Sequence, residues 1–99
     1  MLDQLQLSDF EPLIQQSFTI RFRLPEAELP ALLMAVTPLK SHPGSPRPPF
    51  SLTFRTPQQG QYYQQAMYTL VHPEKGELEL FFVPIGFDAE GMKYEVIFN

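Results

Sequence analysis

Three stretches of the chain alternate apolar and polar residues with a period of two, the pattern of a half-buried β-strand. The first covers residues 17–24, where the even positions from Phe18 to Leu24 are apolar and both arginines fall between them. The others cover residues 50–55 and 92–98, and only Ile97 is out of pattern. The alternation predicts three strands, each with one buried face and one wet face.

Two further stretches, residues 67–72 and 77–85, flank the turn sequence Pro73-Glu74-Lys75-Gly76. Proline presets a helical φ and glycine accepts a positive φ, so these stretches are predicted to form a β-hairpin. The alternation places Glu77 and Glu79 in water and predicts an inward face made of Leu78, Leu80 and Phe82.

The segment from residue 29 to 36 is ambiguous, because it is apolar on both faces of a strand yet contains good helix formers. Pro30 and Pro38 bracket only a short stretch, which favours a strand. Residues 38–49, with five prolines, and residues 56–65, rich in glutamine, are predicted to be long loops. They flank the same strand, so we expect them at its opposite ends.

Ser8-Asp9-Phe10-Glu11 is typical of a helix start, because the side chains of Ser8 and Asp9 accept free amides and acids favour the first turn. We expect a short helix near residues 9–16 that closes one end of the fold, with an inward face formed by Phe10, Leu13 and Ile14. Six strands and one helix predict a single domain over residues 1–99, mainly β, as a small antiparallel barrel or sandwich.

Composition narrows the function classes. Hydrophobic residues make up 43% of 99 residues and include nine phenylalanines, enough for an aromatic core that is stable without disulfides or metals. The absence of cysteine excludes disulfides, thiolate nucleophiles and cysteine-ligated metals. A net charge of −4 leaves no basic footprint for nucleic acid. Residues 1–6 lack a leader pattern and no long apolar run occurs, so we expect no membrane association and a cytoplasmic location.

The two histidines, His42 and His72, lie apart without metal-ligand spacing. The better interpretation of His72 is a turn residue whose ring bonds a nearby backbone group. An enzyme would be indicated if His72 lay within hydrogen-bond reach of Asp88 or Glu95 beside a pocket.

The two pairs of acidic residues are also better explained by structural roles than by metal binding or catalysis. Asp88 and Glu90 could offer oxygens to a cation, but their glycine-flanked segment is typical of a turn. A hydrolase with a carboxylate pair could use Glu77 and Glu79, but both are predicted on the solvated face of a hairpin, where a structural interpretation is better. No serine lies in a nucleophile elbow and no glycine run forms a phosphate loop. We therefore expect no enzyme activity, cofactor or metal.

The strongest interaction signal is Phe81-Phe82-Val83-Pro84-Ile85, because Phe81, Val83 and Ile85 make the outer face apolar as well. Either the N-terminal helix covers these side chains or a partner does, and an unpaired strand edge could add to the contact.

Loop residues supply weaker signals. Tyr62 and Tyr63 either bind a partner or pack over a barrel end. With Arg55, they could also line a barrel that encloses a small ligand. Residues 46–49 could adopt polyproline II, although a stiff connector explains them better.

Three runs, Leu7–Ile14, His72–Pro84 and Gly91–Asn99, are similar to an uncharacterised family of small bacterial single-domain proteins that carries a domain-of-unknown-function label. The resemblance supports a shared fold and transfers no catalytic motif. Some members lie beside proteins with phage-tail-collar-like domains, which implies an assembly accessory. The sequence therefore predicts a non-catalytic protein-interaction or assembly module that binds a protein partner or itself, with a small-ligand-binding barrel as the alternative.

Overall fold

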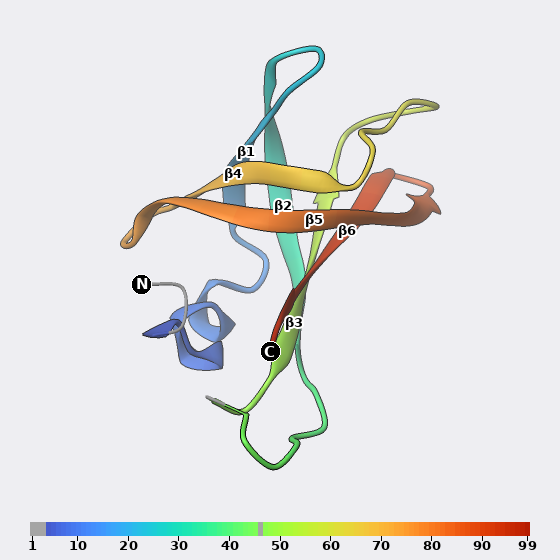
Figure 1. The fold of residues 1–99 in the computed structure, drawn as a ribbon. Helices are drawn as coiled ribbons and strands as arrows, with labels where there is room; N and C mark the ends of the chain where they lie inside the picture. Colours follow the sequence, from blue (N-terminus) through green and yellow to red (C-terminus); the bar gives the residue numbers. More distant parts are fainter. Residues whose placement is uncertain (1–3, 46) are drawn as a thin grey trace.

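The six strands close into one antiparallel barrel in the computed structural model, which describes residues 4–45 and 47–99 (Figure 1). Around the barrel the order is β1-β2-β3-β6-β5-β4. The predicted mainly β antiparallel fold is confirmed, in its barrel form. The strands are β1 (Ser17–Phe22), β2 (Ala27–Pro38), β3 (Phe50–Thr56), β4 (Ala66–His72), β5 (Gly76–Asp88) and β6 (Gly91–Phe98).

Two long strands, β2 and β5, curve the sheet into a barrel. Residues 27–32 of β2 pair with β1 and residues 32–38 pair with β3. In β5, residues 76–82 pair with β4 and residues 83–88 pair with β6. In each of the two strands the pairing register shifts close to the point where one partner strand replaces the other, at Met34 in β2 and at Ile85 in β5. Such bulges bend a strand, so each long strand can serve both sides of the barrel.

The bulge at Met34 explains why the ambiguous segment looked apolar on both faces. Ala31 and Leu33 point inward and are buried, and beyond the bulge Val36 takes the position opposite Leu52 of β3. The segment is a strand, as favoured, but it is longer than predicted and runs through Pro30. That proline lies where β2 pairs with β1 alone, an edge position that tolerates a missing N–H.

Aromatic side chains fill the barrel interior. The predicted inward faces of β1, β3 and β6 are buried, and stacked rings such as Phe50 and Phe98, 4.6 Å apart at their centroids, cross between strands. Leu24 is the exception: β1 ends at Phe22, and the Leu24 side chain is 95% exposed in the following turn, at φ 62°. The predicted inward position of Leu24 is therefore wrong.

The N-terminal helical segment differs from the prediction in type and extent. It consists of two single 3-10 turns, η2 (Leu7–Asp9) and η3 (Glu11–Leu13), in place of one helix over residues 9–16. Gln15 adopts φ 72°, and its N–H already donates to the Leu33 carbonyl of β2, which ends the helical path. Phe10 is fully buried, as expected, while Leu13 and Ile14 are half-buried against the core.

The two long loops leave β3 at opposite ends, as predicted (Figure 1). The loop before β3 forms the lower pole in the view, and the loop after it lies near the β1–β2 turn. Residues 1–3, part of the segment expected to lack a leader pattern, lie outside the described residues.

Candidate functional site

An apolar cluster lies on the outer face of β4 and β5. Met67 and Phe81 are directly opposite each other in the ladder, and their side chains are 43% and 46% exposed. Further along β5, Val83 is half-buried and Ile85 is 47% exposed. We call Met67, Phe81, Val83 and Ile85 the β4–β5 face.

The N-terminal segment does not cover the β4–β5 face. Phe10 packs inside the barrel, with its ring 6.0 Å from Phe50 and 5.6 Å from Phe98. The expectation that Phe10, Leu13 and Ile14 would shield Phe81 is therefore wrong, and the outer side chains are open to solvent.

Acidic side chains border the β4–β5 face. Glu79 accepts a hydrogen bond from the Thr69 hydroxyl, and Glu77 pairs with Arg21. Glu95 of β6 lies opposite Val83. The surface thus combines an apolar centre with a charged rim, the usual anatomy of a protein interface.

Sequence reasoning missed Met67, although a signal existed. Counting outward from the tight turn between His72 and Gly76 places residue 67 opposite residue 81. The predicted hairpin therefore already contained the pair.

Tyr63 closes the barrel end from the loop after β3. Its ring stacks on Phe22 with 4.3 Å between centroids. Its hydroxyl donates to the Pro25 carbonyl at 2.7 Å, and its backbone N–H donates to the Tyr94 hydroxyl at 2.9 Å. These contacts agree with packing over a barrel end, one of the two predicted alternatives.

Tyr62 behaves differently from its neighbour. Its side chain is 55% exposed and meets Phe87 edge-on, with the ring centroids 6.3 Å apart. Tyr62 therefore presents an aromatic surface to solvent.

Tyr68 and Tyr94 lie beneath this loop. Tyr94 donates to Gln58 Oε1 at 2.7 Å, and Tyr68 donates to the Gln64 carbonyl at 2.6 Å. Burial raises the pKa of both hydroxyls, so both stay protonated across the neutral range.

A groove of about 980 Å³ runs between the β1–β2 turn and the loop after β3. Tyr62, Tyr63 and Met67 line it together with Arg23, whose guanidinium donates to the Met67 carbonyl. Its size lies at the upper end of ligand sites. The concave surface is on the outside of the barrel, because aromatic rings occupy the interior.

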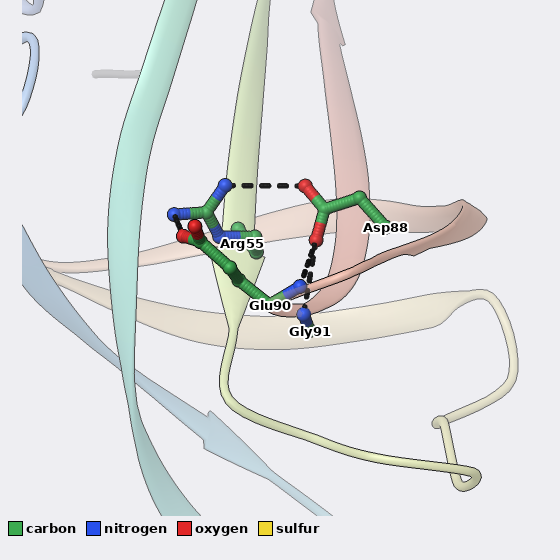
Figure 2. A network of polar contacts seen from close by, with 4 residues as sticks. All are labelled: Arg55, Asp88, Glu90 and Gly91. Carbon is green, nitrogen blue, oxygen red and sulfur yellow. Dashed lines mark hydrogen bonds and ion pairs between the residues drawn. The ribbon is translucent and has the colours of Figure 1, made fainter.

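Arg55 does not line this groove, so its predicted grouping with the two tyrosines is wrong. Figure 2 shows the guanidinium between two acids, with Nη1 3.1 Å from Asp88 Oδ2 and Nη2 2.7 Å from Glu90 Oε1. The other oxygen of Asp88 accepts the backbone N–H groups of Glu90 and Gly91. These bonds, first that from Glu90, hold the pKa of Asp88 below its usual value.

The network stabilises the β5–β6 turn, as the turn interpretation of Asp88 and Glu90 predicts. Gly91 is required there: a Cβ at this position would lie 1.8 Å from the Thr56 carbonyl oxygen. Within the described part of the chain no group of three acids or histidines could hold a metal ion.

His72 is buried and joins the N-terminal turns to the β4–β5 turn. Its Nδ1 accepts the backbone N–H groups of Glu74 and Lys75 at 3.0 and 3.1 Å. Because Nδ1 accepts, Nε2 carries the proton and donates to the Asp9 carbonyl at 2.9 Å. Backbone groups therefore occupy both ring nitrogens, the arrangement expected of a turn residue.

The remaining sequence candidates lie apart from these features. His42 is exposed in the loop before β3, which is closed by the bond from Leu39 N–H to the Pro49 carbonyl. Arg47 lies over the rings of Phe50 and Phe98, which ties the proline-rich segment to the barrel as a connector. Pro46, part of the predicted polyproline run, lies outside the described residues.

No helix among residues 4–45 and 47–99 is long and apolar enough to cross a membrane.

The fold and surface define a small closed antiparallel β-barrel with an apolar outer face. Residues 5–98 match the model of a protein family described as Domain of unknown function (DUF6916), and the chain belongs to this family. The expected membership in a family of unknown function is thus confirmed. The comparisons with curated proteins and with solved structures found no match.

Proposed function

We propose that this protein is a non-catalytic interaction module that binds another protein through the β4–β5 face. The observation that carries the proposal is the direct pairing of Met67 with Phe81 on the outer face, both over two fifths exposed. An aromatic ring and a flexible thioether in contact form the kind of adaptable apolar surface that protein partners bury.

The distribution of polar groups supports a binding role over a catalytic one. Both ring nitrogens of His72 bond to backbone groups, and Arg55 forms ion pairs with Asp88 and Glu90 at a turn. These titratable groups stabilise the fold, and none of these four residues lines the groove.

The proposal includes an assembly role in a bacterial cytoplasm, beside phage-tail-collar-like proteins. Its support is the family resemblance of the three runs at Leu7–Ile14, His72–Pro84 and Gly91–Asn99.

The test compares association of the wild type with Phe81→Glu and Ile85→Glu. Sedimentation equilibrium measures self-association, and surface-immobilised protein measures binding of a purified phage-tail-collar-like neighbour. We expect at least tenfold weaker association in both variants, because a carboxylate must be desolvated in an apolar contact.

Leu39→Glu is the matched control, because Leu39 is an exposed apolar residue that lies outside the β4–β5 face. It belongs to the loop before β3, which forms the lower end of the barrel in Figure 1. It should leave association unchanged. Equal association of all four proteins, or no association of the wild type in either assay, would contradict the proposal.

A further inference from the structure

The groove beside the β1–β2 turn exists because β1 and β4 separate. Their pairing ends at Arg21 and Thr69, while β4 continues to Ala66 with β5 as its partner. The groove opens in this gap, and Tyr68 forms part of its wall. Strands that diverge in this way leave room for an added extended segment.

The charge of the groove differs from that of the whole protein. The chain carries a net charge of −4, yet among residues 4–45 and 47–99 Arg23 is the only charged side chain that lines the groove, and no carboxylate of these residues does. The other polar lining groups are glutamine amides and tyrosine hydroxyls. Among the described residues the charge inside the groove is therefore positive, while Glu26 and Glu28 line a neighbouring hollow that shares Arg23 with it.

Arg23 differs from Arg21 and Arg55 in its partners. Arg21 pairs with Glu28 and Glu77, and Arg55 pairs with Asp88 and Glu90. Across the described residues, Arg23 has no carboxylate partner, and its one hydrogen bond goes to the Met67 carbonyl. A guanidinium has five N–H donors, so most of its capacity for a carboxylate is free.

Three exposed apolar side chains line the same groove as Arg23. Leu24 is almost fully exposed at the β1–β2 turn, Tyr62 is exposed on the opposite loop, and Met67 lies on β4. An extended peptide presents side chains at alternate positions, so a carboxylate can meet Arg23 while its bulky neighbours reach these apolar groups.

We infer that this groove binds an extended acidic peptide segment of a partner protein, with a carboxylate on Arg23 and a bulky apolar side chain against Leu24, Tyr62 and Met67. This groove adjoins the β4–β5 face and shares Met67 with it. Arg23 belongs to the groove alone and Ile85 to the β4–β5 face alone, so substitutions at these two residues test the two proposals separately.

The experiment selects a phage-displayed random peptide library on the immobilised protein. Wild type should enrich sequences with Asp or Glu beside a bulky apolar residue. Arg23→Glu should reverse the preference toward Lys and Arg, because the groove charge is inverted. Arg21→Gln, a matched loss of a neighbouring arginine outside this groove, should select the same acidic sequences as wild type.

Fluorescence anisotropy with one selected acidic peptide gives the magnitude. Arg23→Gln should weaken binding about tenfold, since one charge-assisted pair is lost, and added salt should weaken the wild type. Leu39→Glu, in the loop before β3 and outside this groove, should bind the peptide as wild type does. Unenriched or charge-neutral selections, or equal affinity of wild type and Arg23→Gln, would overturn the inference.

Discussion

His72 Nε2 donates a hydrogen bond to the backbone carbonyl of Asp9 across 63 positions of the chain. The same ring accepts two backbone N–H groups of the turn that follows β4, and it meets Phe10 and Phe18 edge-on. One imidazole thus fastens the N-terminal turns to the barrel.

Replacing this ring by a benzene ring should destabilise the protein. His72→Phe keeps the aromatic packing but leaves two amides and one carbonyl without partners, so we expect a loss of about 2–4 kcal/mol in the free energy of unfolding. Urea unfolding followed by circular dichroism measures it. His42→Ala, in the exposed loop, is the control and should change stability by less than about 0.5 kcal/mol. A loss for His72→Phe as small as that of the control would contradict the role of His72 in holding the N-terminal turns against the barrel.

Gly91→Ala should be far more damaging than Gly76→Ala. The new Cβ would overlap the Thr56 carbonyl, which belongs to the backbone and has little freedom to move, so we expect a loss of about 3 kcal/mol or more. At Gly76 nothing lies within 4 Å of an added Cβ and only the φ of 75° is unfavourable, which costs about 1–2 kcal/mol. Thermal melts of both variants separate the two effects, and equal losses would show that the close approach at Gly91 is not the constraint.

The lowered pKa of Asp88 predicts a dependence of stability on pH. A carboxyl whose folded pKa lies below its unfolded value adds stability above the unfolded pKa, near pH 4, and loses it as the pH falls through the folded value. Asp88→Asn should therefore be less stable than wild type near neutral pH, and the difference should shrink below pH 4. Urea midpoints measured across this range test the sign. A stability difference between wild type and Asp88→Asn that stays constant with pH would contradict a contribution of Asp88 ionisation to stability.

The buried hydroxyl of Tyr94 predicts the opposite behaviour in alkali. Its raised pKa means that the folded state retains the proton longer, so stability falls as the pH rises beyond the unfolded value near 10. Tyr94→Phe should cost about 1–2 kcal/mol at neutral pH, because the Tyr63 N–H and Gln58 lose their partner. It should also lose less stability than wild type between neutral and strongly alkaline pH. Unfolding curves recorded across alkaline pH check both statements, and identical alkaline profiles would count against them.

Sequence periodicity predicted the buried face correctly wherever a strand keeps one pairing register along its whole length. Phe50, Leu52 and Phe54 point inward as the alternation requires, and the hairpin around Gly76 forms as predicted. The alternation fails at Met34 and Ile85, because a bulge inserts one residue and shifts the faces, and neither residue type announces one.

The sites depended on contacts that local patterns do not encode. The Phe81 signal was visible because three outward positions of one strand are apolar. The groove could not be predicted from the sequence, since it arises where β1 and β4 diverge. The position of Arg23 follows from that tertiary geometry. Arg55 was assigned to the wrong group because its acidic partners lie more than thirty positions away.

The most direct test of the interaction surface is site-specific photo-crosslinking in the native host. A photoreactive phenylalanine analogue is introduced at Phe81 or, as a control, at Leu39. We predict a discrete crosslinked product from position 81, its loss when Ile85→Glu is added, and none from position 39. Equal crosslinking from both positions, or a product at position 81 that persists in Ile85→Glu, would contradict binding through the β4–β5 face.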